Sequence, residues 1–369
     1  MLSLVGIIIL IHLPRLYIEC KSRFFGKNGK THCEDNYQKS RNKDLDNRIV
    51  AWEVFDLNNS EWEDYLNNVP KNLINFYRKE FKDLLKDVSD QDLVSFKNSD
   101  DVNSYETFGE IICTWIDKDK KIIKSCFNHE YCSGYFFLRY GSIISHGVNP
   151  EPAKFPNIPF IPEYSLLKMA IKKPHLPISN CFNTDIKREE IKRISFNIDI
   201  SNKPQNISSR TFILWNVMTI LNKIHQKDYN IMIPLIFTSL KNIWNNVGAV
   251  FIKWPENGMD MEILDKTIND CKYQAIATNL YLRGIPSSST GKDGRKNVDI
   301  IFTTGYIKNP KKISKYHLAT FNNVPDYGIY CQTITYNKLT SISLTISTKQ
   351  FNFDNLITNI KDKYDYKLF

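Results

Sequence analysis

The chain has 369 residues, of which 42% are hydrophobic and 24% charged, a composition that supports a sizeable folded core. Its 13% of aromatic residues, with only 14 Gly and 15 Pro, excludes a collagen, a coiled coil and a fully disordered chain. The net charge of +9 suits an acidic partner such as a phosphorylated ligand, an anionic membrane or nucleic acid, and it equally fits a solvated lysine-rich surface.

The N-terminus begins with an apolar run, residues 2–11 (LSLVGIIILI), which is too short for a bilayer span of about 20 residues. No basic residue precedes the run, and no A-x-A-like cleavage site follows it before Cys20. Three interpretations remain open: a weak signal or anchor, an interfacial segment, and a buried strand. We expect a cytoplasmic protein, and the apolar run leaves peripheral membrane attachment open.

Regular elements follow in the first half. Residues 48–55 (RIVAWEVF) alternate as a strand does, and residues 60–85 have apolar positions at helical spacing with an interruption near Pro70. Residues 108–116 and 121–127 are β-rich and flank a charged turn, which predicts a hairpin.

A helix is expected over residues 135–146, and the proline-rich stretch 149–164 is the best candidate for a linker or crossover. Beyond it, Ser208 or Ser209 can cap a buried helix that runs to residue 224. Strands are expected over residues 191–200, 230–238, 246–254, 298–307, 328–337 and 339–348. Two further helices are expected at about 260–282 and 353–363, with a flexible loop at 284–297.

The cysteines and glycines exclude several classes of site. The eight cysteines form no C-x-x-C pair and no Cys/His cluster at zinc spacing, so we expect reduced core cysteines and no metal. Neither G-x-G-x-x-G nor G-x-x-x-x-G-K-[ST] occurs, and kinase, P-loop and simple dehydrogenase functions lose their main support.

His129 follows the second strand of the predicted hairpin, in a tight turn before a helix. A strand end fixes the backbone, and the small residue Gly134 leaves room for a substrate, so His129 is a candidate general base. The alternative is a core histidine with no catalytic role.

The run FNHEYCSGYFFLR (127–139) resembles the HHxxxDG signature of the CoA-dependent acyltransferase superfamily. This superfamily contains the chloramphenicol acetyltransferases, condensation domains, alcohol acetyltransferases and wax ester synthase/diacylglycerol acyltransferases. On this match His129 is the catalytic second histidine, Asn128 replaces the first, and Ser133 replaces the motif aspartate.

Further segments are similar to the two-half members of the superfamily, in the same order. They include a buried helix opening the second half, an "NNxG"-like run before a strand ending in proline, the strand VDIIFTTGYI and a closing hairpin. The resemblance implies an α/β (α+β) fold of two chloramphenicol acetyltransferase-like subdomains, each a mixed sheet flanked by helices, with a tunnel between them. The implied organisation is an apolar then basic segment 1–45, a first subdomain 46–150 with the His motif, a Pro-rich crossover 151–165 and a second subdomain 166–369.

The implied activity is acyl transfer from acyl-CoA, as co-substrate, to a hydroxyl acceptor such as a long-chain alcohol or diacylglycerol at a membrane or droplet. His129 would be the general base, and Thr303 or Thr304 would supply the donor to the oxyanion. Three residues of the 284–297 loop are implied to contact the CoA phosphates: Lys292, Arg295 and Lys296.

Two other functions remain open. Ser133 cannot form the ion pair of the motif aspartate, so a catalytically degenerate acyltransferase fold that serves as a binding module is the first alternative. A basic, aromatic-rich nucleic-acid binder is the second, although no RNA- or DNA-binding motif supports it. Release of a thiol from acyl-CoA distinguishes the enzyme from the binding module.

Overall fold

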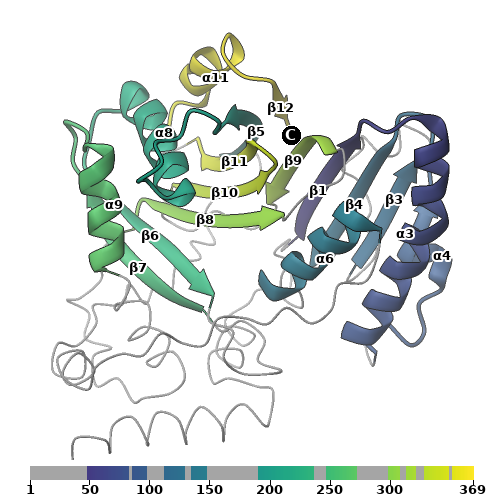
Figure 1. The fold of residues 1–369 in the computed structure, drawn as a ribbon. Coiled ribbons are helices and arrows are strands. Elements are labelled where there is room, and N and C mark those ends of the chain that lie inside the picture. The colour runs from purple at the N-terminus through teal and green to yellow at the C-terminus, as the bar shows by residue number, and fades with distance from the viewer. Residues whose placement is uncertain are drawn as a thin grey trace, which may run out of the picture.

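The computed structural model consists of two β-sheets with helices packed against them (Figure 1). The residues that the structure describes are 48–82, 85–97, 112–128, 134–147, 190–236, 247–271, 298–307, 313–320, 328–348 and 351–369. The apolar run 2–11 and the proline-rich stretch 149–164 lie outside them, so the expectations for both remain predictions.

The first sheet has five strands in the order β2-β3-β4-β1-β9. Its strands are β1 (Arg48–Phe55), β2 (Val94–Phe96), β3 (Ile112–Asp117), β4 (Ile122–Asn128) and β9 (Ile313–Thr320). The predicted hairpin is confirmed, because β3 and β4 pair antiparallel around a turn at Lys121, whose φ of 53° is left-handed. The parallel pairing of β2 with β3 makes the sheet mixed.

Three helices accompany the first sheet: α3 (Asn59–Glu80), α4 (Asp90–Leu93) and α6 (Gly134–His146). Helix α3 begins at a capping box between Asn58 and Glu61. The expected interruption near Pro70 is wrong, since α3 continues through this residue. A proline inside a helix costs about 3 kcal/mol, but α3 buries a stripe on both sides of it, and this packing outweighs the lost backbone bond. The stripe consists of Trp62, Leu66, Val69, Leu73, Phe76 and Tyr77.

The second sheet has seven strands in the order β12-β5-β11-β10-β8-β6-β7. These are β5 (Ile191–Asp199), β6 (Tyr229–Ile236), β7 (Val247–Trp254), β8 (Ile300–Ile307), β10 (Ile329–Tyr336), β11 (Leu339–Ser347) and β12 (Tyr366–Leu368). Strands β6, β8 and β10 run parallel, and the other pairings are antiparallel. One face packs against α8 (Ser209–Ile224), α9 (Met261–Asp270) and α11 (Phe353–Lys361), with Ser208 capping α8 as predicted. The predicted fold of two mixed sheets flanked by helices is therefore confirmed.

Strand β9 connects the two sheets and was not predicted from the sequence. It pairs antiparallel with β1, although it follows β8 in the chain, and it also packs against β5 and β11 of the second sheet. The His317 Nδ1 on β9 lies 3.3 Å from the Ser195 Oγ on β5, and the backbone N–H of Tyr316 donates to the Tyr336 hydroxyl at 3.2 Å. The boundary predicted at 151–165 remains a prediction. Strand β9 follows this boundary in the sequence and nevertheless completes the first sheet.

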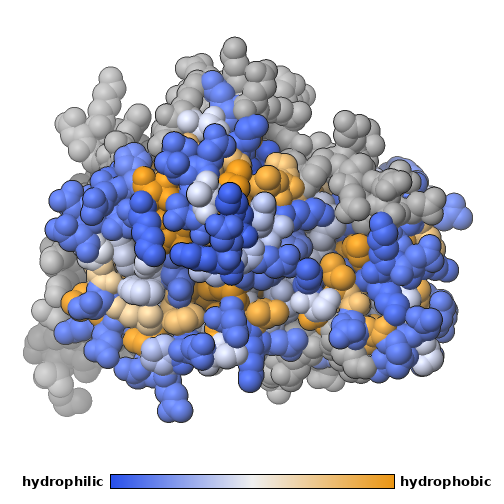
Figure 2. All heavy atoms as spheres, turned by 90° about the horizontal axis from the view of Figure 1, so that it is seen from above, coloured by the Kyte–Doolittle hydropathy of each residue, from blue (hydrophilic) through white to orange (hydrophobic). Residues whose placement is uncertain are grey.

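The surface of the described residues offers few large apolar side chains. The face of the molecule that is seen from above the view of Figure 1 is mainly hydrophilic, with hydrophobic areas between the polar groups (Figure 2). The large apolar side chains that are more than a third exposed come from four separate elements: Phe96, Ile263, Tyr306, Tyr366 and Leu368. No helix among the described residues is long and apolar enough to cross a bilayer.

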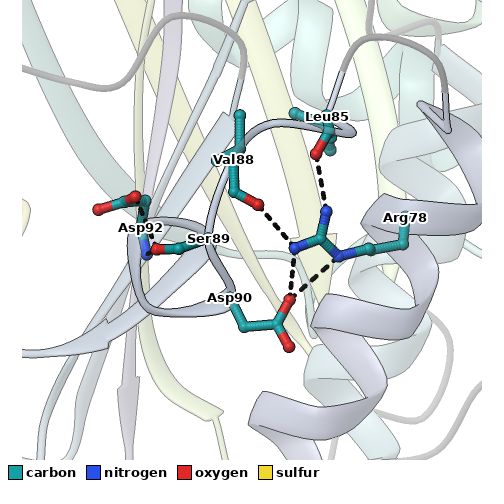
Figure 3. Close-up of polar contacts among 6 residues, drawn as sticks. All are labelled: Arg78, Leu85, Val88, Ser89, Asp90 and Asp92. Atoms are coloured by element: carbon teal, nitrogen blue, oxygen red, sulfur yellow. Dashed lines mark hydrogen bonds and ion pairs between the residues drawn. The ribbon is translucent and has the colours of Figure 1, made fainter.

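An arginine clamp fastens the segment after α3 to that helix (Figure 3). The Arg78 guanidinium donates to the backbone oxygens of Leu85 and Val88, both at 2.7 Å, and pairs with the Asp90 carboxylate at 2.6 Å. Ser89 then caps α4 by accepting the N–H of Asp92 at 3.1 Å. One side chain therefore sets the path by which the chain leaves α3 and enters β2.

We expect Arg78→Ala to lower the free energy of unfolding by about 1–2 kcal/mol, because two backbone oxygens lose a charged donor. Asp90→Asn is the matched control: it removes only an exposed ion pair and should cost less than about 1 kcal/mol. Urea unfolding of both variants measures the difference. Equal losses would show that the ion pair, and not the backbone contacts, holds this segment.

Candidate functional site

The strand and the helix that flank the predicted catalytic turn are both present. Strand β4 ends at Asn128, which pairs with Arg48 of β1, and α6 begins at Gly134. His129 and Ser133 lie between these ends, outside the described residues. The strand–turn–helix arrangement expected around His129 is thus supported on both sides.

An aromatic cluster joins the two arms of this turn. The ring of Phe127, next to the end of β4, lies 5.3 Å from the rings of Phe136 and Phe137 and 4.6 Å from that of Tyr140. Three of these four side chains are buried, and Phe137 is partly buried. Edge-to-face contacts of this kind favour one mutual orientation, so the packing fixes how α6 lies on β4.

A chain of buried hydrogen bonds shares Tyr140 with the aromatic cluster. The Tyr77 hydroxyl lies 2.8 Å from the Thr114 Oγ1, which lies 2.9 Å from the Ser125 Oγ. The Tyr140 hydroxyl lies 2.7 Å from the Ser125 Oγ and 3.0 Å from the Glu53 Oε1. This chain joins α3, β3, β4, α6 and β1.

Glu53 has an unusual environment for a carboxyl group. It is fully buried, and the loss of water raises its pKa to about 8, although hydrogen bonds from the Tyr140 and Tyr316 hydroxyls lower the pKa in part. Its Oε2 has no hydrogen-bond partner. Burial also raises the pKa of both tyrosines well above the usual value, so they stay neutral. Glu53 is therefore mostly protonated at neutral pH.

The predicted oxyanion donors lie on β8, in the second sheet. The Thr304 Oγ1 accepts a long hydrogen bond from the Arg210 Nε at 3.4 Å, and the Thr303 Oγ1 donates to the Cys331 oxygen at 3.5 Å. Successive residues of a strand point to opposite faces, so Thr304 faces α8 while Thr303 faces the other side of the sheet. Burial lowers the pKa of Arg210, and the sequence did not indicate this residue.

Helix α6, which follows the His129 turn in the chain, is in contact with β8, the strand of Thr303 and Thr304. Gly141 on α6 packs so closely on β8 that an added Cβ would lie 3.3 Å from the Ile307 Cγ1. Ile307 and Tyr140 belong to the same hydrophobic core. The helix that leaves the His129 turn is therefore packed against the strand that carries both threonines.

His317 is a second histidine that the sequence did not single out. It is 7% exposed, and burial, followed by the nearby charge of Lys367, lowers its pKa to about 4. A group with this pKa is a weak base, so His317 is better explained as part of the β9 junction. Lys292, Arg295 and Lys296 lie outside the described residues. Within those residues no group of three or more His, Cys, Asp or Glu is arranged to hold a metal ion.

No family model and no curated protein sequence matches this chain. Solved structures match its fold. The wax ester synthase/diacylglycerol acyltransferase from Marinobacter aquaeolei VT8 has a TM-score of 0.51 at 10% identity, covering 89% of this chain and 96% of that one. F. sporotrichioides TRI101, in complex with coenzyme A and T-2, has a TM-score of 0.50 at 8% identity, covering 92% and 97%. The chain thus has the two-subdomain fold that the resemblance implied.

The raised pKa of Glu53 predicts a pH-dependent stability. The unfolded chain loses this proton near pH 4.5, and the folded chain loses it only near pH 8, because the pKa of Glu53 is raised to about 8. The stabilising effect of the proton is therefore complete at low pH and is lost as the pH rises through this window. Between pH 5 and 8 the free energy of unfolding should therefore decline, and we expect Glu53→Gln to remove the part of this decline that comes from Glu53. Urea unfolding at several pH values measures it. An unchanged slope in the variant would mean that Glu53 is ionised in the folded protein.

Proposed function

We propose that this chain, which has the fold of CoA-dependent acyltransferases, transfers an acyl group from acyl-CoA to a hydroxyl acceptor. The observation that carries the proposal is the contact of α6 with β8, because it unites the arm of the His129 turn with the strand of Thr303 and Thr304. A long-chain alcohol or diacylglycerol is the proposed acceptor. The TRI101 complex with coenzyme A supports CoA as the carrier.

In the proposed reaction His129 removes the proton from the acceptor hydroxyl, whose oxygen attacks the thioester carbon. The tetrahedral intermediate carries a negative oxygen, and its collapse forms the ester and breaks the carbon–sulfur bond. The CoA thiolate then takes the proton back from His129. No bond forms between the acyl group and the protein.

Thr303 and Thr304 are both candidate donors to the oxyanion: Thr303 lies on the face of β8 that α6 contacts through Ile307, whereas Thr304 has the freer hydroxyl. The Thr304 oxygen accepts from Arg210, which leaves its own hydrogen available, whereas the Thr303 hydroxyl donates to a backbone oxygen. The guanidinium also brings a positive charge next to this hydroxyl, and such a charge would favour a negative oxygen. We further propose that Lys292, Arg295 and Lys296 bind the CoA phosphates at the mouth of a tunnel between the subdomains, and that residues 2–11 contact the membrane that holds the acceptor.

A catalytically degenerate binding module is the second candidate. Arg139 of α6, near Ser133 in the sequence, forms an ion pair with Glu80 of α3. Ser133 has no charge and cannot form the ion pair of the motif aspartate. Binding of acyl-CoA without turnover would favour this candidate.

His129→Ala should reduce thiol release from acyl-CoA by about 10²–10⁴-fold in the presence of an alcohol, because the reaction loses its general base. Release is followed with a thiol-reactive chromophore across acyl chains of different length. The control is His225→Ala, which changes an exposed residue at the end of α8. A fully active His129→Ala enzyme would remove this residue from the mechanism.

Thr304→Val should lower kcat by roughly 10²-fold or more while leaving the KM for acyl-CoA nearly unchanged, since the oxyanion exists only after attack. Thr303→Val, the matched variant on the same strand, should have a much smaller effect. Steady-state kinetics of the two variants gives the comparison. A larger loss in Thr303→Val would assign the oxyanion to the face of β8 that α6 contacts.

A further inference from the structure

We propose that Tyr140 is a positioning residue for His129, held in place by Ser125 and Glu53. The catalytic role of Tyr140 rests on the proposed function. Its effect on the position of His129 can be measured without any turnover. The Tyr140 hydroxyl sets how β4 and α6, the two arms of the His129 turn, lie against each other.

The two arms meet at the Tyr140 hydroxyl. Ser125 is on β4, the arm that enters the turn, and Tyr140 is on α6, the arm that leaves it; their hydroxyls are 2.7 Å apart. The contact of the Tyr140 ring with Phe127 fixes the distance between the arms, but apolar packing alone tolerates sliding. A short buried hydrogen bond is directional. The bond between Tyr140 and Ser125 therefore also fixes the position of α6 along β4.

Glu53 decides which way the hydrogen of Tyr140 points. A phenol has one hydrogen, so Tyr140 donates either to Ser125 or to Glu53. When Glu53 is protonated, its own O–H can donate to the Tyr140 oxygen, and Tyr140 then donates to Ser125. When Glu53 is ionised, Tyr140 must donate to the carboxylate, and the hydrogen bonds along the chain reverse direction.

Only neutral groups face Glu53 among the described titratable residues. Tyr65 and Tyr77 approach it from α3, Tyr140 from α6 and Tyr316 from β9. Burial raises the pKa of all four phenols well above the usual value, so none of them titrates near pH 8. A transition of the Tyr140 contacts in this range therefore belongs to Glu53, whose pKa is raised to about 8.

The test uses ¹³C-labelled histidine in the full chain, with the His129 signal assigned by His129→Gln. We expect Tyr140→Phe, which keeps the ring and removes the hydroxyl, to shift or broaden the His129 signal and to leave that of His225 unchanged. Tyr229→Phe is the matched control, since it removes another buried tyrosine hydroxyl, which donates to the His225 oxygen in the second subdomain at 2.9 Å; the His129 signal should not move in that variant.

Kinetics and pH give a second measurement. Tyr140→Phe should lower kcat roughly tenfold with little change in KM, because a misplaced base slows only the chemical step. Wild-type kcat should fall above about pH 8, and Glu53→Gln, which keeps a neutral donor beside Tyr140, should abolish that fall.

The outcomes separate this inference from the proposed function. An unchanged His129 signal in Tyr140→Phe would overturn the positioning role. If Tyr140→Phe does not fold, Ser125→Ala removes the same hydrogen bond from the side of β4. The His129 signal must then shift or broaden in Ser125→Ala. No turnover in the wild type with any acyl-CoA would refute acyl transfer, while the histidine signals would still decide the role of Tyr140.

Discussion

The first sheet depends on the burial of one carboxyl group. Placing an ionised carboxylate in a protein interior costs several kcal/mol, and Glu53 avoids this cost by remaining protonated and by bonding to tyrosine hydroxyls. The hydrogen-bonded chain that includes Glu53 takes one side chain from each of six elements. These are Glu53 of β1, Tyr77 of α3, Thr114 of β3, Ser125 of β4, Tyr140 of α6 and Tyr316 of β9. No one of these elements can shift without breaking a buried polar contact.

Local patterns predicted most of the fold, because most elements have regular apolar spacing. The alternation in 48–55 marked β1, and the serine at 208 marked the start of α8. Strand β9 was missed because its sequence, ISKYHLAT, places polar residues where a strand buried between two sheets is expected to be apolar. His317 is accommodated there by Ser195, a residue far away in the sequence. Pro70 misled the prediction for the opposite reason, since a local rule gave way to tertiary packing.

The candidate site could be predicted only in part. A resemblance in the order of segments indicated His129 and the two threonines, and the structure places β8 against α6. Arg210 and Glu53 were missed because their significance comes from partners on other elements. A signal for Glu53 was nevertheless present: in RIVAWEVF it occupies the same face as Ile49, Ala51 and Phe55, which are all buried. A single acid on an apolar face indicates a buried carboxyl.

The place of β9 in the first sheet has a consequence for synthesis on the ribosome. Until residues 313–320 have emerged, β1 is an open edge with unpaired backbone groups, and Glu53 lacks the hydroxyl of Tyr316. The first sheet therefore remains incomplete until almost the entire chain has been translated. Pairing across such a sequence separation is slow, and an exposed edge strand is open to other chains meanwhile. Nascent chains of this protein should consequently depend on chaperones more than their size alone would imply.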